Sequence, residues 1–227
     1  MAARDFKTRL ARRASKAGLQ LPDTLTEQLT AYYELLSRWN RKINLTALDD
    51  PDQAIDRLLL EPVIAARQAP GSVRTLMDVG SGGGSPAIPL ALSLNVRSLV
   101  MVEVKARKSA FLREATRTLG LGAVAEVENA RFEEVLGKPS MLEHFDLLSI
   151  RAVRVEGRVL NTVQAFVRPG GAVFLFRGPS GPERPEFLPP LEWRSTVTLL
   201  DSLQSRLTVA EKTLRISDVP RGTSAGL

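Results

Sequence analysis

The sequence predicts an α/β protein in which a doubly wound, mostly parallel sheet of seven strands follows an N-terminal helical extension. Three observations support this prediction. Short apolar runs alternate with segments of helical period between residues 75 and 176, which is typical of βαβ crossovers. The first apolar run leads directly into a cluster of glycines. Two stretches of alternating apolar residues then end the pattern, and they predict an antiparallel pair at one edge of the sheet.

Length and composition fit one such domain with a modest extension. The chain has 227 residues, 44% hydrophobic content and no cysteine, so thiolate sites and disulfides are excluded. His144 is the only histidine; we expect it in a loop before a strand, and we expect no metal site. No apolar run is long enough for a transmembrane helix, and the N-terminus lacks the apolar core of a secretory signal. We therefore expect a cytoplasmic protein with no membrane contact, and a monomer.

The predicted organisation has three parts: a basic leader and helical extension at 1–70, a sheet domain at 71–219, and a disordered tail at 220–227. A helix is expected from Pro22 onward, because apolar residues recur there at helical spacing. These residues are Leu25, Leu29, Tyr32, Tyr33, Leu36 and Trp39. Their aromatic members could stack on bases, although core packing is the more common role of such a stripe. A second helix opens at Pro51, and Pro62 is expected to kink or end it.

The leader is strongly basic. Before Pro22, six basic residues face one acidic residue, a local balance of +5 within a net charge of +6; the basic residues are Arg4, Lys7, Arg9, Arg12, Arg13 and Lys16. Two interpretations remain open. The leader could attract phosphates without regard to sequence, or it could be a solvated and partly frayed segment.

Strands and helices alternate through the sheet domain. The predicted strands are 75–79, 99–104, 123–127, 147–150, 172–176, 193–199 and 206–213. The predicted helices between them are 87–93, 107–119 and 156–166.

The glycine cluster, residues 80–84, favours a nucleotide-like cofactor. Glycines permit positive φ angles and close approach of the backbone to a ligand, as expected at Gly80 and Gly82. Asp78 precedes the cluster and can accept from the ammonium group of S-adenosylmethionine, while Glu103, after the second strand, can accept both ribose hydroxyls. Alone, these two carboxylates are equally explained as a cap and a solvated strand end. Their joint placement favours S-adenosylmethionine over NAD.

The segment after the third strand is where such folds contact adenine. Phe132 could cover the ring, and the backbone of Phe132 and Glu133 could contact its edge. A surface turn with a buried phenylalanine is the alternative interpretation.

Several motifs together resemble one family, the bacterial ribosomal small subunit methyltransferase G family, also called glucose-inhibited division protein B. The resemblance extends from about Tyr32 to Lys212. Its most specific motif is the W-N-x-x-x-N-L-T run at residues 39–46. The others lie at 78–89, 107–113, 130–134, 149–152 and 176–178.

The resemblance implies a class I, Rossmann-like methyltransferase fold and methylation of N7 of a guanine in the 530 loop of 16S ribosomal RNA. The substrate would be the RNA or a small-subunit particle. It also implies cofactor contacts from Gly80, Ser85, Phe132, Glu133 and Arg151, with Glu103 at the ribose. Trp39, Asn40, Asn44 and Thr46 would link the extension to the sheet domain.

The chain departs from the family pattern at three places. A His-x-x-Asp-Ser pattern is usual where residues 57–62 read Arg-Leu-Leu-Leu-Glu-Pro. Arg177 replaces a lysine, and Ser85 and Ala87 replace a bulky apolar residue and a glycine.

Guanine N7 has a free lone pair, so its attack on a sulfonium methyl group needs no general base. We accordingly expect no catalytic acid or base, and a rate that depends on positioning. Arg151 and Arg177 are assigned to binding RNA phosphate or a base edge; an ion pair at the sheet edge is the alternative.

Three other functions remain open: an NAD-dependent oxidoreductase, an RNA-binding module of this fold without turnover, and a methyltransferase acting on another target.

Overall fold

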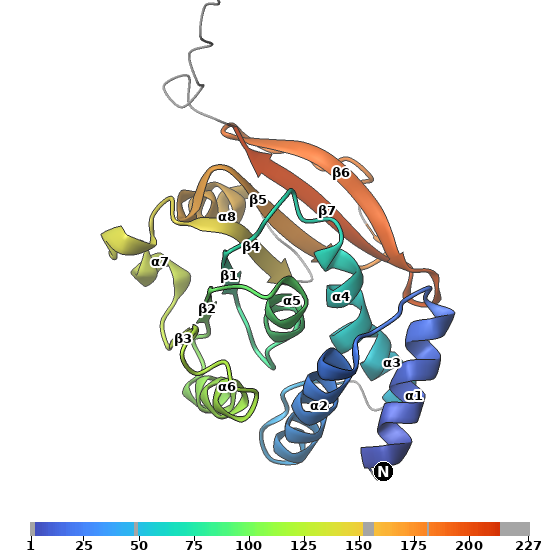
Figure 1. The fold of residues 1–227 in the computed structure, drawn as a ribbon. Coiled ribbons are helices and arrows are strands. Elements are labelled where there is room, and N and C mark those ends of the chain that lie inside the picture. Colours follow the sequence, from blue (N-terminus) through green and yellow to red (C-terminus); the bar gives the residue numbers. More distant parts are fainter. Residues whose placement is uncertain (1–2, 48–49, 152–156, 181, 214–227) are drawn as a thin grey trace, which may run out of the picture.

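The computed structural model describes residues 3–47, 50–151, 157–180 and 182–213. In these residues one sheet has seven strands in the order β3-β2-β1-β4-β5-β7-β6 (Figure 1). The strands are β1 Thr75–Val79, β2 Ser98–Val102, β3 Ala125–Glu128, β4 Phe145–Arg151, β5 Val167–Arg177, β6 Leu191–Leu200 and β7 Ser205–Lys212.

The first five strands are parallel to one another. The last strand, β7, lies between β5 and β6 and is antiparallel to both. The predicted seven-stranded sheet with an antiparallel last strand is therefore confirmed. The two stretches of alternating apolar residues form the antiparallel pair β6 and β7 at one edge of the sheet, as predicted.

Helices cover both faces of the sheet. Side chains alternate along each strand, so neighbouring residues pack against helices on opposite faces. Leu76, Leu99 and Leu147 pack with the extension and with helices α5 (Ala87–Leu94) and α6 (Ala106–Thr118). Their neighbours in sequence point the other way, toward α7 (Phe132–Val135) and α8 (Gly157–Val163). Short 3-10 segments occupy Pro139–Met141, Gln164–Phe166 and Asp201–Leu203.

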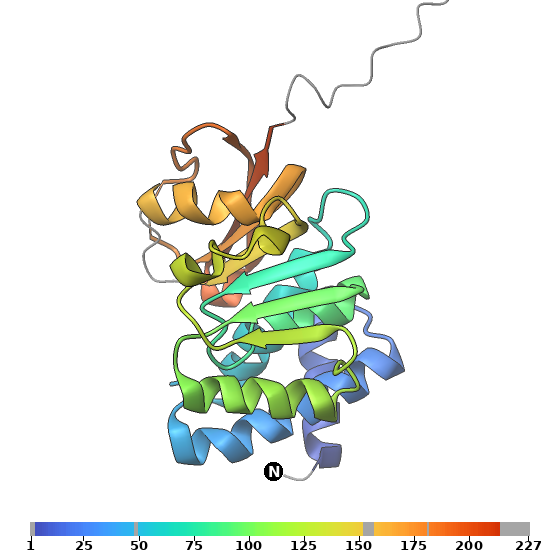
Figure 2. The same cartoon turned by 90° about the vertical axis from the view of Figure 1, so that its left-hand side faces the viewer.

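The extension consists of α1 (Ala3–Lys16), α2 (Asp23–Ile43), α3 (Pro51–Ala54), a π-helical segment at Ile55–Leu60, and α4 (Glu61–Ala66). Figure 2 shows α2 alongside α6. The predicted stripe on α2 is core: Leu29, Tyr32 and Leu36 are buried. Trp39 packs edge-on against Phe111, with ring centroids 5.8 Å apart.

The basic leader is a docked helix, so the interpretation as a frayed segment is wrong for the residues described. Phe6, Leu10 and Ala14 recur at helical spacing and are buried against the rest of the extension. The apolar residues are separated by arginines in the sequence, and at helical spacing they indicate an amphipathic helix with one buried face. The net charge of the segment does not reveal this pattern.

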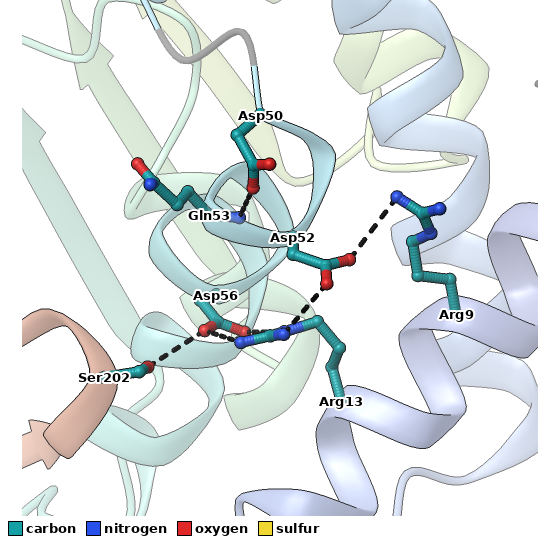
Figure 3. A network of polar contacts seen from close by, with 7 residues as sticks. All are labelled: Arg9, Arg13, Asp50, Asp52, Gln53, Asp56 and Ser202. Carbon is teal, nitrogen blue, oxygen red and sulfur yellow. Dashed lines mark hydrogen bonds and ion pairs between the residues drawn. The ribbon is translucent and has the colours of Figure 1, made fainter.

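One of its arginines is held by acidic residues rather than solvated. Arg13 forms a two-pronged ion pair with Asp56 and also contacts Asp52, at 3.1 Å (Figure 3). Ser202, in the turn between β6 and β7, donates to the same Asp56 carboxylate. The cluster therefore joins α1, the π-helical segment and the far end of the sheet.

Pro62 was predicted to kink or end its helix; it does not end it, and the irregularity lies in the turn before it. The backbone widens into the π-helical segment before Pro62 and returns to α-helix through Ala66. Pro62 has no N–H to donate to the Leu58 carbonyl one turn earlier, and the Ser85 hydroxyl donates to that carbonyl instead, at 2.8 Å. A side chain from the loop before α5 thus replaces the missing backbone bond.

His144 lies in the loop before β4, as predicted. The expected disordered tail falls outside the described residues. Within the part of the chain that the structure describes, no helix is long and apolar enough to cross a membrane.

Candidate functional site

The loop after β1 requires its glycines. Gly80, Gly82 and Gly84 have φ angles of 77°, 53° and 84°, a region that side chains strongly disfavour. At Gly84 a Cβ would also lie 2.7 Å from Ile88 Cδ1. The N–H groups of Gly80 and Ser81 donate to the Val102 carbonyl, which fixes the loop to the end of β2.

A cavity of about 440 Å³ opens beside this loop, at the carboxyl ends of the parallel strands. Its volume is typical of small-molecule sites. It brings together Gly80, Glu103, Phe132, Glu133 and Arg151, five of the residues that the sequence predicts for the cofactor.

Glu103 lies immediately after β2 and is 6% exposed. Its two carboxylate oxygens accept from the backbone N–H groups of Gly82 and Lys105, each at 2.8 Å. A carboxylate has about four acceptor positions, so each oxygen can still accept one further donor. Asn129 donates to the Glu103 carbonyl and so braces the strand end.

Phe132 and Glu133 begin the short helix α7, whose first turn borders the cavity. The Phe132 ring is half-buried and packs against the core below the sheet, whereas Glu133 is exposed. The phenylalanine therefore has one face on the core and borders the cavity, and this position satisfies part of both interpretations from the sequence.

Asp78 is buried on the face of the sheet that the extension covers, and it is 1% exposed. Burial raises its pKa to about 6, although a hydrogen bond from Ser149 and the charge of Arg151 act in the opposite direction. Its Oδ2 atom has no hydrogen-bond partner among the residues that the structure describes. An unsatisfied buried carboxylate oxygen is costly, so a donor supplied by a ligand would stabilise it.

A second cavity, of about 240 Å³, lies on the other side of the glycine loop. Gly82 and Ser85 border it together with Thr46, Arg57 and Leu58 from the extension. Gly80 and Arg151 border both cavities, so the two spaces meet beside these residues.

Arg151, at the end of β4, lies between the cavities. Its Nη1 donates to Glu61 Oε2 at 2.6 Å, and its guanidinium lies 4.8 Å from the centre of the Phe176 ring. Burial lowers the pKa of Arg151, against the opposing charge of Glu61. Its Nε and Nη2 atoms are buried and have no partner in the described part of the chain.

Arg177 lies elsewhere and borders neither cavity. Its Nη2 donates to the Pro182 carbonyl at 2.7 Å, and its Nη1 contacts the Thr208 hydroxyl. Partial burial and the neighbouring Arg206 lower its pKa. In this structure Arg177 ties the end of β5 to Pro182, in the segment between β5 and β6.

Of the four residues that the resemblance assigns to linkage, Trp39 bonds directly to the sheet domain, and Asn40, Asn44 and Thr46 shape the turn after α2. Trp39 donates to Glu114 on α6, and Asn40 accepts from the Thr46 N–H at 2.8 Å. Asn44 ends α2 in the left-handed region, with φ of 49°. The turn that follows presses Leu45 against Gly83 of the glycine loop.

Three residues at the site were not found from the sequence. Tyr32 donates from α2 to the Gly83 carbonyl, Ser149 donates to Asp78, and Glu61 holds Arg151. Glu61 did have a signal, since it is a lone carboxylate after the apolar run Leu58-Leu59-Leu60. Tyr32 and Ser149 had none, because each acts on a residue far away in sequence.

Solved structures with the same fold are methyltransferases. A putative O-methyltransferase from Klebsiella pneumoniae has a TM-score of 0.57 and 15% identity, and the match covers 87% of this chain and 93% of that one. Geranyl diphosphate C-methyltransferase from Streptomyces coelicolor, solved with S-adenosyl-L-homocysteine, has a TM-score of 0.51 and 13% identity, with 66% and 75% covered. The chain thus has the fold of the class I, Rossmann-like methyltransferases, with its glycine loop at the carboxyl ends of the parallel strands.

The family follows from sequence comparison. Residues 25–185 match the model of rRNA small subunit methyltransferase G. Relatives of that name from Stenotrophomonas maltophilia and Xylella fastidiosa strain M23 are 35% and 36% identical, over 71% and 76% of this chain and 73% and 78% of theirs. The chain belongs to this family, whose members are S-adenosylmethionine-dependent methyltransferases, and the resemblance seen in the sequence is confirmed. An oxidoreductase is not favoured.

Proposed function

We propose that this protein transfers the methyl group of S-adenosylmethionine to N7 of a guanine in the 530 loop of 16S ribosomal RNA. The observation that most supports it is the cavity beside the glycine loop. There Glu103 offers spare acceptor positions and Arg151 borders the space. The Nε and Nη2 atoms of Arg151, and Oδ2 of Asp78, which is buried and borders neither cavity, have no described partner.

The residues present fit this cofactor. Glu103 would accept from the ribose hydroxyls, Phe132 would cover the adenine, and Asp78 would accept from the ammonium group. The positive-φ backbone at Gly80 and Gly82 leaves room for close approach, and Ser85 holds the start of α5 against the extension. When bound, S-adenosylmethionine supplies an electrophilic methyl group beside this loop.

The chain's own contribution to the reaction would be positioning. Guanine N7 attacks through its lone pair and has no proton to lose, so no side chain must act as a base. Holding the guanine in line with the methyl group and excluding water would supply the rate. Arg151 and Arg177 would bind cofactor or RNA rather than take part in a bond-forming step.

The target side involves the extension. We assign cofactor binding to residues 71–219 and RNA contact to 1–70, where Arg12 and Lys16 remain exposed on α1. Such residues would attract phosphate through counterion release. The substrate would be 16S RNA or a small-subunit particle, and the enzyme would act as a cytoplasmic monomer.

The cofactor assignment is tested by calorimetry on Gly82→Asp. The new side chain would stand at φ 53° beside Glu103, and like charge plus strain should abolish measurable S-adenosylmethionine binding. Gly18→Asp is the matched control, because it has φ 68° and open space around it; its binding should equal the wild type. Unchanged binding by Gly82→Asp would contradict the assignment.

The target is tested on ribosomal RNA from a deletion strain. Borohydride and aniline cleave RNA at N7-methylguanosine, so the strain should lose one cleavage site in 16S RNA and regain it with the wild-type gene. Purified protein should also methylate small-subunit particles from that strain. Cleavage without change would remove the proposed target, and absence of transfer would favour an RNA-binding module without turnover.

A further inference from the structure

Glu61 is a buried carboxylate that the proposed function leaves without a role. It opens α4 in the extension, and its side chain is 2% exposed. It contacts two arginines, with Arg151 Nη1 at 2.6 Å and Arg57 Nη1 at 4.0 Å. A buried charge is tolerated only when it is paired, so the position of Glu61 is tied to that of Arg151.

The contact with Glu61 uses only one corner of the Arg151 guanidinium. It occupies Nη1 and leaves Nε and Nη2 without described partners. Those two nitrogens form the lateral edge of the planar group, whose parallel N–H bonds match the two oxygens of a carboxylate or phosphate. The Phe176 ring lies on the face of the same guanidinium. Glu61 and Phe176 together therefore leave one bidentate donor edge buried and without a described partner.

The acceptor for this edge can be chosen from the surrounding charges. A two-point contact to guanine would use O6 and N7, but N7 must keep its lone pair for methyl transfer. Among the described residues, Asp78 Oδ2 and Glu61 Oε1 are also buried oxygens without a hydrogen-bond partner, and the charge of Arg151 acts to lower the pKa of Asp78. Glu61 already holds Arg151 through its other oxygen, so Asp78 Oδ2 is the acceptor left for a ligand. One donor edge and one acceptor oxygen are complementary to the carboxylate and ammonium groups of an α-amino acid.

We propose that Glu61 is a positioning residue, which orients Arg151 so that its lateral edge binds the α-carboxylate of S-adenosylmethionine. The inference rests on the proposed cofactor. It makes the extension, through α4, a determinant of which end groups the methyl-donor site accepts.

The test compares three ligands by calorimetry on the full chain. S-adenosylmethionine has both amino-acid charges, decarboxylated S-adenosylmethionine keeps only the ammonium group, and 5′-methylthioadenosine has neither. For Glu61→Gln we expect the affinity for S-adenosylmethionine to fall roughly ten- to hundredfold, as for loss of a charged hydrogen bond. The affinities for the other two ligands should change less than about threefold.

Asp56→Asn is the matched control. Asp56 is also a buried carboxylate paired with an arginine, one turn earlier, but it contacts α1 rather than the cavities. It should lower stability without changing the ratio of the three affinities. Should Glu61→Gln fail to fold, Arg151→Gln should show the same selective loss.

The outcomes separate this inference from the proposed function. Equal losses for all three ligands, or no loss, would overturn the role of Glu61 while leaving the cofactor assignment intact. Failure of the wild type to bind any of the three would overturn the proposed function itself.

Discussion

At the scale of single residues, the proposed methyl-donor site includes polar groups that the fold buries and leaves partly unsatisfied. Asp78 and Arg151 are the clearest cases, since each has hydrogen-bonding capacity without a described partner. Such groups cost folding free energy when the site is empty of ligand. A ligand with complementary charges returns that free energy on binding, which is a general way for a protein to make affinity specific.

The titration of Asp78 gives a first prediction. Its pKa of about 6 lies above its ordinary value of 3.8, so the ionised form that accepts from an ammonium group is lost below about pH 6. Affinity for S-adenosylmethionine should therefore fall about tenfold per pH unit below 6 and stay constant above it. Calorimetry across this range measures it. Asp78→Asn should bind weakly at every pH, and a flat wild-type profile would contradict the prediction.

The same shift has the opposite consequence for stability without ligand. Between about pH 4 and 6 the folded protein holds a proton on Asp78 that the unfolded chain has released. This group should therefore destabilise the fold as pH rises through that range, by on the order of 3 kcal/mol. Urea unfolding of the wild type and Asp78→Asn should diverge over that interval. If the free energies of unfolding of the two proteins changed in parallel with pH, burial would not raise the pKa of Asp78.

The predictability of the site from sequence also divides by residue. Gly80 and Glu103 could be placed beside one cavity from the sequence, because a βαβ unit places strand ends and the first loop at one edge whatever the helices do. Asp78, also predicted for the cofactor, is buried and borders neither cavity. Glu61 and Tyr32 could not be found from the sequence, since their roles depend on how the extension packs onto the loop. Arg177 also lies at the end of a strand, but it borders neither cavity, so its predicted place in the site could not be inferred from that position alone.

At the scale of elements, the fold was predictable where one pattern dominates. The parallel strands are mostly short apolar runs, and each predicted one was found; four have both ends within two residues of the prediction, whereas β5 begins five residues earlier than predicted. The π-helical segment was not predictable from local sequence. The Leu58 carbonyl, which cannot accept from Pro62, accepts instead from Ser85, a residue far along the chain. The leader helix was missed in part, because its arginines suggested solvent while their partners lay some forty residues away in the chain.

Ser85→Ala tests the substitution of a side-chain bond for a backbone bond. It should destabilise the protein by about 1–2 kcal/mol, because the Leu58 carbonyl would be left without a donor. Adding Pro62→Ala should recover part of the loss by restoring a backbone N–H. Urea unfolding of the two single variants and the double variant checks this, and strictly additive effects would count against it.

The docking of α1 makes a second prediction at this scale. Arg13→Met would leave the buried Asp56 without its cation, at a cost of about 3 kcal/mol. Arg9→Met should cost less than about 1 kcal/mol, because Arg9 and Asp52 are each about one-third exposed and 3.4 Å apart. If both variants lost the same free energy of unfolding, the Arg13 ion pair with Asp56 drawn in Figure 3 would not stabilise α1 more than the Arg9 ion pair does.

At the scale of the whole molecule, the extension and the glycine loop form one packed unit. Tyr32 bonds to Gly83, Leu36 and Leu45 pack on it, and Ser85 bonds to Leu58. The proposed cofactor site therefore borders on both predicted parts of the chain, since the extension packs directly on the glycine loop.

Hydrogen exchange tests this unity. S-adenosylmethionine at a hundred times its dissociation constant should stabilise the protein by about 2.7 kcal/mol. Added protection should appear in the glycine loop and also in the C-terminal half of α2 and the π-helical segment. Strand β6, at the far edge, should gain protection only through global unfolding. Protection confined to the loop would show that the extension is energetically separate.

The insertion of β7 between β5 and β6 has a consequence during synthesis. Strand β6 leaves the ribosome before β7, yet β7 is its neighbour in the sheet. The five parallel strands can associate first. Until β7 is present, one edge of β5 has unpaired backbone groups and β6 has no partner strand in the sheet. A bare edge pairs readily with other chains, so the interval before β7 emerges is when this protein is most exposed to aggregation. An enzyme that acts on the ribosome's own RNA would thus depend on the ribosome for timely delivery of its last strand.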